Sequence, residues 1–138
     1  MTNKLNINVR SFSYKKEIPV DPSGNGGGFV FDCRGILNPG RIKNYKSLTG
    51  RDREVIEYLE NETKILEYLE NVFAIVDLTI EDYIQRDFTN LEVNFGCTGG
   101  QHRSVYSADA LAKHIQEKFP EVQVTLKHVI QAEKNWIN

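Results

Sequence analysis

The chain has 138 residues, of which 40% are hydrophobic and 26% are charged. This length and composition fit one folded domain over residues 1–138 and exclude a disordered or low-complexity chain. The formal net charge of −2 also argues against a broadly basic surface of the kind that binds nucleic acid, although it leaves room for a local basic patch.

No targeting or membrane segment is recognisable in the sequence. Residues 1–6 lack the apolar stretch of a signal peptide, and no run approaches the length of a membrane span. We therefore expect a cytoplasmic protein without membrane contact, in which Cys33 and Cys97 are free thiols. The cysteines and the three histidines show no ligand-spaced cluster, and no dinucleotide fingerprint is present, so we expect neither a metal nor a cofactor.

The first quarter of the chain alternates between strand patterns and a loop. Leu5, Ile7 and Val9 alternate with polar residues and predict a first strand. Residues 19–28 combine proline, aspartate, asparagine and glycines, which predicts a loop, and the apolar run 29–33 then predicts a buried strand. Polar groups follow this strand, at the end where open α/β sheets place their ligand sites.

The rest of the chain is predicted to be mainly helical. Asp52 is the predicted N-cap of a first helix, and apolar residues recur at helical spacing over 55–59 and again over 65–84. A third helical stripe covers 105–119, and residues 122–128 alternate as a last strand.

An alternating apolar segment over 91–96 precedes the third helix. Together with the last strand it forms a strand-helix-strand unit, which is parallel and right-handed in most α/β domains. The sequence therefore predicts a single α/β domain with a small, mostly parallel sheet flanked by helices, and with a phosphate-binding loop between a strand and a helix.

That loop is the most informative stretch of the chain. Residues 96–104 read Gly-Cys-Thr-Gly-Gly-Gln-His-Arg-Ser and end where the third helix starts. The first N–H groups of a helix have no internal partners and carry partial positive charge, so the junction is suited to an anion. Gly99 and Gly100 allow close backbone approach, and Arg103 adds a cation whose geometry matches phosphate oxygens. The loop predicts a phosphate site.

The same residues also fit the Cys-x5-Arg-Ser loop of cysteine-dependent phosphatases. In that chemistry the Cys97 thiolate attacks phosphorus, Arg103 holds the equatorial oxygens and Ser104 assists the leaving thiolate. An acid must also protonate the leaving alcohol, and the sequence offers Asp32 and Asp52 without selecting either. Because free cysteine is common at strand ends, we favour a structural role for this residue, and enzymatic activity stays open.

Other polar residues are candidates for the same site. Arg34 could bind phosphate or pair with Asp32. Thr49 and Gly50 could close over a ligand or form a plain turn, and His128 could face the same pocket from the last strand.

Several motifs, in this order, resemble the C-terminal domain of RapZ, the bacterial RNase adapter protein family. The likeness covers about residues 7–134. Its motifs are Ser11-Phe12-Ser13-Tyr14-Lys15, Phe31-Asp32-Cys33-Arg34 followed by Asn38-Pro39, Leu48-Thr49-Gly50, and the loop 96–105. The family often carries a histidine directly after Asn-Pro, where this chain has Gly40.

The resemblance implies an α/β domain that senses glucosamine-6-phosphate and takes part in RNA binding and in recruiting an RNase. It implies that Asp32 contacts a sugar hydroxyl or amine, and that Thr98, Gly99 and Arg103 hold the phosphate. RapZ also has a separate N-terminal nucleotide-binding domain with a kinase-type phosphate loop. This chain contains no G-x-x-x-x-G-K-[ST] sequence, so nucleotide handling is not implied for it.

The leading hypothesis is a phosphate- or phosphosugar-binding sensor or adaptor without chemistry of its own. The alternatives are a phosphatase that uses Cys97 and Arg103, and an RNA-binding adaptor that recruits a protein partner. The candidate ligand-binding residues are Asp32, Arg34, Cys97, Thr98, Gly99, Gly100, Gln101, His102, Arg103 and Ser104, with Thr49, Gly50 and His128 as secondary candidates.

Overall fold

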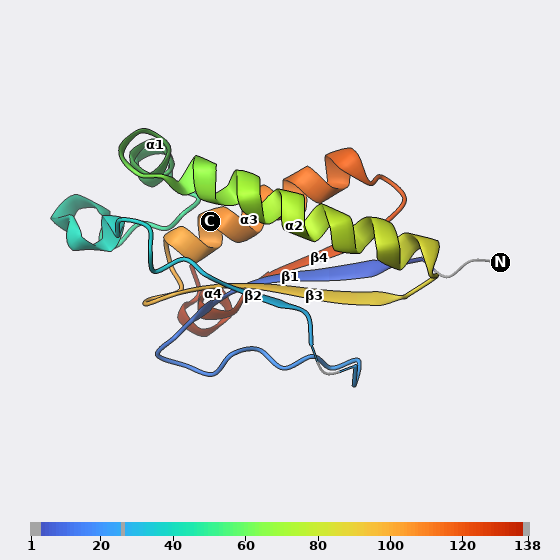
Figure 1. Ribbon diagram of the computed structural model, residues 1–138. Coiled ribbons are helices and arrows are strands. Elements are labelled where there is room, and N and C mark those ends of the chain that lie inside the picture. The colour runs from blue at the N-terminus through green and yellow to red at the C-terminus, as the bar shows by residue number, and fades with distance from the viewer. Residues whose placement is uncertain (1–3, 26, 137–138) are drawn as a thin grey trace.

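Four parallel strands form one sheet in the computed structural model, which describes residues 4–25 and 27–136 (Figure 1). They are β1 (Asn6–Ser13), β2 (Phe29–Asp32), β3 (Asn90–Cys97) and β4 (Gln123–His128), in the spatial order β2-β3-β1-β4. Each neighbouring pair is parallel. The predicted α/β class is confirmed, and β3 and β4 are separated in the sheet by β1.

The helices are α1 (Arg53–Glu62), α2 (Ile65–Gln85), α3 (Arg103–Lys118) and α4 (Val129–Lys134). The first three match the predicted apolar stripes, and Asp52 is the N-cap residue of α1. The 3-10 turn η1 (Pro39–Arg41) lies at the turn-forming sequence Asn38-Pro39-Gly40, whereas the 3-10 turn η2 (Lys43–Tyr45) and the short α4 were not predicted. Among the helices in the described part of the chain, none combines the length and apolar character needed to cross a membrane.

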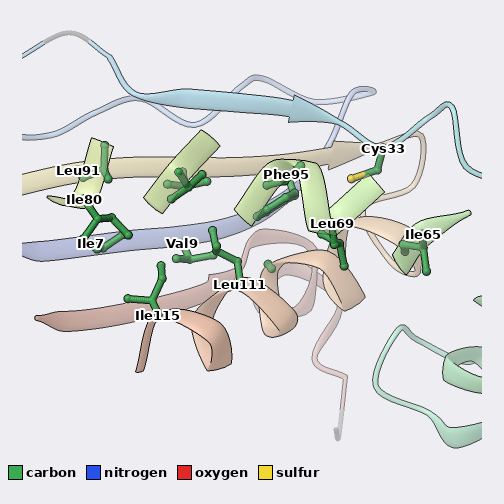
Figure 2. Close-up of a cluster of buried hydrophobic side chains, with 14 of the residues drawn as sticks. Ile7, Val9, Cys33, Ile65, Leu69, Ile80, Leu91, Phe95, Leu111 and Ile115 are labelled. Atoms are coloured by element: carbon green, nitrogen blue, oxygen red, sulfur yellow. The ribbon is translucent and has the colours of Figure 1, made fainter. Parts of the chain in front are cut away.

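The core lies between the sheet and the helices on one of its faces. Figure 1 shows α2 and α3 over one face, while the segment between β1 and β2 runs along the other. Successive strand residues point to opposite faces, so alternate apolar residues of β1 and β3 meet the apolar stripes of the two helices. Figure 2 shows this cluster, in which Ile7, Val9, Phe95, Leu111 and Ile115 are fully buried.

The connections that follow the two central strands, β1 and β3, lead to opposite edges of the sheet. The chain passes from β1 to β2 at one edge, and from β3 through α3 to β4 at the other edge. Ligands bind at such a switch point, outside the carboxyl ends of the strands. Ser13 and Cys97 are register partners there, so the loop that follows Cys97 begins at this crevice.

Candidate functional site

A cavity of about 380 Å³ opens beside the carboxyl ends of β2 and β3. Its wall combines the segment after β2, the η1 turn, one residue of α1 and the loop before α3. The lining residues are Arg34, Gly35, Ile36, Leu37, Asn38, Arg41, Ile42, Tyr58, Thr98 and Arg103. Among these described residues three are arginines and none is acidic, so the wall favours an anionic ligand.

Arg103 is the first residue of α3 and is held in the wall of this cavity. Its side chain is buried, with 4% of the residue exposed. Its Nη1 donates to the carbonyl oxygens of Ile36 at 2.7 Å and Arg34 at 3.2 Å. Its Nε is buried without a hydrogen-bond partner, and no carboxylate of the described residues pairs with the guanidinium. A buried cation that keeps an unused donor is suited to an anion entering the cavity.

Arg34 forms an ion pair with Asp32 and also lines the cavity. Its Nε lies 2.9 Å from Oδ1 of Asp32, and its Nη2 lies 2.7 Å from Oδ2. This hydrogen-bonded guanidinium holds the pKa of Asp32 below its usual value, so the carboxylate stays ionised. The Arg34 guanidinium also stacks on the Tyr14 ring, 3.9 Å from its centre. The two sequence-based alternatives for Arg34 are therefore compatible with each other.

The loop between β3 and α3 needs only one of its two adjacent glycines for its backbone shape. Gly100 has φ +66°, and a Cβ there would lie 2.7 Å from Cγ1 of Ile130 and 2.9 Å from the Ser13 nitrogen. Gly99 leaves open space at the same position. Thr98 lines the cavity, and its carbonyl oxygen accepts a 2.6 Å hydrogen bond from Ser13 Oγ. Because Gly100 has no Cβ, the loop can pack closely against β1 and α4, whereas Gly99 is exposed.

Cys97 lies beneath the loop. Its Sγ is 3.1 Å from Oγ of Ser104, and the two residues are 2% and 0% exposed. Neither residue is among those that line the cavity. Cys33 is also a buried free thiol, and burial raises its pKa to about 12.

Gln101 joins the loop to the segment before α1. Its Nε2 donates to the carbonyl oxygens of Lys46 at 2.9 Å and Leu48 at 2.7 Å. The Gly50 nitrogen in turn donates to the Gln101 carbonyl oxygen at 2.9 Å. A Cβ on Gly50 would collide with the backbone of α3, so glycine permits this close approach. Gln101 and Gly50 thus hold the loop against the segment before α1, and the Thr49 nitrogen donates to Asp52 Oδ2 at 2.7 Å. None of these three residues is among those that line the cavity.

His102 also contacts this segment. Its Nε2 lies 2.9 Å from the Tyr45 carbonyl oxygen, which fits a neutral ring that carries its proton on Nε2. Burial lowers the pKa of His102, which favours the same neutral form. A Cβ on Gly40 would lie 3.3 Å from Cε1 of this ring. The ring thus packs beside Gly40.

His128 lies outside the residues that line the cavity. Its Nδ1 is 2.6 Å from Ser11 Oγ, and its Nε2 is 2.8 Å from Oδ1 of Asp109. Burial alone would raise the pKa of Asp109, but hydrogen bonds from His128 and Arg51 outweigh it and lower that pKa. Because Ser11 is fully buried, this Ser-His-Asp contact joins β4 to β1 and α3 and presents no nucleophile.

Sequence reasoning missed Arg41 and Tyr58, which also line the cavity. Arg41 sits on η1, whose start is fixed by a 2.9 Å hydrogen bond from the Gly40 nitrogen to Asn38 Oδ1. The Asn-Pro-Gly sequence signals that turn. No local signal relates the turn to Tyr58, which lies on α1.

The fold and the cavity define an α/β domain with an arginine-lined pocket at the carboxyl ends of its strands. The family described as the RapZ C-terminal domain matches residues 5–130, and the chain belongs to that family.

Curated relatives support the family assignment. A protein of Endomicrobium trichonymphae is 32% identical over 127 residues, which cover 92% of this chain and 42% of the relative. A Nitrosomonas eutropha protein is 37% identical over 96% of this chain and 43% of its own length, and a Xylella fastidiosa strain M12 protein is 38% identical over 85% and 39%. All three are named nucleotide-binding proteins. The chain spans about two-fifths of the length of these relatives.

Proposed function

We propose that this domain binds a small phosphorylated metabolite in the arginine-lined cavity, as a sensor or adaptor without chemistry of its own. The observation that carries the proposal is the buried Arg103 guanidinium, which has no carboxylate partner among the described residues and keeps its Nε unused. A phosphate oxygen at this nitrogen would satisfy the donor and balance the charge. The N-terminus of α3 adds favourable potential at the same place.

The ligand that we favour is an amino sugar phosphate such as glucosamine-6-phosphate. Its phosphate would lie against Arg103 and Thr98, which line the cavity. Its ammonium group would extend toward Asp32, which lies outside the lining residues and whose carboxylate stays ionised in its pair with Arg34. A nucleotide is the competing ligand, because the relatives are named nucleotide-binding proteins. Those relatives are more than twice as long as this chain, which lacks a kinase-type phosphate loop, so we favour the sugar phosphate.

Thermal unfolding with added ligand tests this proposal. A ligand at 100 times its Kd adds about 2.7 kcal/mol of stability, which raises Tm by roughly 5–12 °C in a domain of this size. We expect glucosamine-6-phosphate to give this shift and glucose-6-phosphate, AMP and inorganic phosphate to give smaller shifts. If AMP gives the largest shift, the ligand is a nucleotide, and if none of the four shifts Tm, the binding proposal fails.

Matched variants locate the site. Arg103→Gln should abolish the shift, and Arg41→Gln, which changes an exposed residue of the cavity wall, should reduce it. Arg53→Gln alters an exposed arginine on α1 outside the cavity and should leave the shift unchanged. Equal shifts in all three variants would place the ligand elsewhere.

A cysteine-dependent phosphatase is the second candidate function, favoured by the 3.1 Å contact between Cys97 and Ser104. The burial of both residues outside the cavity lining disfavours it. Hydrolysis of p-nitrophenyl phosphate decides between the readings. Turnover lost in Cys97→Ser and kept in the matched Cys33→Ser variant would establish an enzyme, whereas no turnover would leave a binding domain.

An RNA or RNase partner is the remaining candidate and rests on the family match alone. Electrophoretic binding to RNA at 50 and 200 mM salt tests it, because phosphate contacts weaken steeply as salt rises. No retention at the lower salt would exclude direct RNA binding by this domain.

A further inference from the structure

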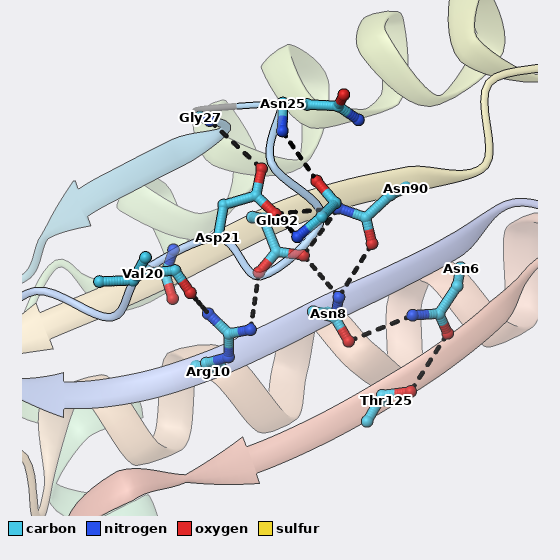
Figure 3. A network of polar contacts seen from close by, with 12 residues as sticks. Asn6, Asn8, Arg10, Val20, Asp21, Asn25, Gly27, Asn90, Glu92 and Thr125 are labelled. Atoms are coloured by element: carbon cyan, nitrogen blue, oxygen red, sulfur yellow. Dashed lines mark hydrogen bonds and ion pairs between the residues drawn. The ribbon is translucent and has the colours of Figure 1, made fainter.

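The face of the sheet opposite α2 and α3 carries a partly buried polar network (Figure 3). Asn8 and Arg10 of β1 lie beside Asn90 and Glu92 of β3 on this face. Glu92 is only 2% exposed, and its Oε1 lies 2.7 Å from Arg10 Nη2. Its Oε2 accepts hydrogen bonds from the side-chain amides of Asn8 and Asn90. The network neutralises Glu92 internally, as a buried carboxylate requires.

Asn94, the next β3 residue on this face, keeps an unused acceptor. Only 4% of the residue is exposed, and its Oδ1 is buried without a hydrogen-bond partner. Its Nδ2 lies 3.5 Å from the Phe29 carbonyl oxygen. In this orientation of the amide the Nδ2 donor faces an acceptor, and the Oδ1 acceptor faces no donor. Buried polar side-chain atoms are normally paired, so the Oδ1 points to a missing hydrogen-bond donor.

Asn94 lines a hollow of about 280 Å³ between the sheet and the loop over residues 19–28. The other lining residues are Pro19, Val20, Asp21, Gly27, Gly28, Val30 and Glu92. This hollow shares no lining residue with the arginine-lined cavity. Gly28, at φ +145°, packs against the Glu92 backbone where a Cβ would collide, so backbone forms that part of the wall. The hollow is therefore partly open to solvent, separate from the arginine-lined cavity, and has its own chemistry.

We propose that this hollow binds a small organic amine in its ammonium form. An ammonium group supplies the donor that Asn94 Oδ1 lacks, and the Asp21 carboxylate in the same wall supplies a negative partner. Asp21, Glu92 and Arg10 together carry one net negative charge, which one monocation balances. Pro19, Val20 and Val30 offer apolar surface for the carbon chain of the amine.

The same wall disfavours other ligand classes. An anion would meet two carboxylates, and the described residues that line the hollow include no arginine or lysine. A divalent metal ion would have to approach Glu92 where Arg10 already occupies Oε1. An organic ammonium ion can bind Asn94 and Asp21 without displacing Arg10.

Titration of the full chain with n-butylammonium chloride, followed by ¹H–¹⁵N NMR, tests the proposal. We expect saturable shifts at the Asn94 side-chain amide and at the Gly27 and Gly28 amides, which sodium chloride at equal ionic strength does not reproduce. Shifts that fail to saturate, or that sodium chloride matches, would overturn the proposal.

Variants separate this site from its surroundings and from the phosphate site. Asn94→Leu removes the acceptor at similar volume and should weaken butylammonium binding by about tenfold or more. Asp21→Asn, on an exposed loop, should also weaken it, which keeps the test decisive if Asn94→Leu fails to fold. The control Asn61→Leu changes an exposed α1 residue and should bind as wild type. Arg103→Gln should also bind normally, so failure of the phosphate proposal would leave this result unaffected. Unchanged affinity in both Asn94→Leu and Asp21→Asn would refute the assignment.

Discussion

Replacing Gly100 by alanine should destabilise the domain strongly, whereas the same change at Gly99 should not. At φ +66° an alanine incurs about 1–2 kcal/mol of backbone strain. Its Cβ would also meet Ile130 Cγ1 at 2.7 Å and the backbone of Phe12 and Ser13 at 2.9 Å. Side-chain atoms can shift but strand backbone cannot do so freely, and such overpacking adds about 1–3 kcal/mol. The expected loss is therefore about 2–5 kcal/mol.

Urea unfolding with linear extrapolation measures both variants. Gly99→Ala is the matched control, because its Cβ meets no atom within 4 Å and its φ is not in the left-handed region. We expect a change within about 0.5 kcal/mol, or a small gain from a less flexible unfolded chain. Equal losses in the two variants would show that the loop does not pack on β1 and α4 as described.

Three further outcomes follow from groups at or near the site. Gly50→Ala should cost about 2–4 kcal/mol in urea unfolding, because its Cβ would collide with the α3 backbone, while Gly35→Ala, with open space around it, should cost little. The lowered pKa of His102 means that the unfolded chain binds a proton more readily than the folded chain, so stability should fall as pH drops below about 6.5. His102→Gln should flatten that part of the pH profile, and an unchanged slope would contradict the assignment. Cys33, whose pKa burial raises to about 12, should not react with Ellman's reagent at pH 8 until urea unfolds the protein. A rapid reaction that Cys33→Ser removes would show that this thiol is accessible.

The strand-loop-helix unit around the site was predictable because its signals are local. Alternation over 91–96, the glycines and the following helical stripe are read within one short stretch, and β3 and α3 have nearly those bounds. The two short elements η2 and α4 were not predicted, because three and six residues are too few to show a helical apolar stripe.

Two features could not be predicted because they depend on tertiary contacts and strand order. They are the presence of Arg41 and Tyr58 in the cavity wall and the location of His128. Arg41 and Tyr58 enter the wall because α1 packs beside η1, which is a tertiary contact. His128 ends β4, and the alternation of that strand does not reveal that β1 separates it from β3. Strand order therefore decides that His128 contacts Ser11 and Asp109.

The Arg103 side chain donates hydrogen bonds to the backbone carbonyl oxygens of residues 34 and 36. Every residue has such a carbonyl group, whatever its side chain. The position of the Arg103 guanidinium thus does not depend on which side chains residues 34 and 36 carry. During evolution the side chains at these positions can therefore change, and the ligand preference with them, while the hydrogen bonds that hold the Arg103 guanidinium in the cavity wall are kept.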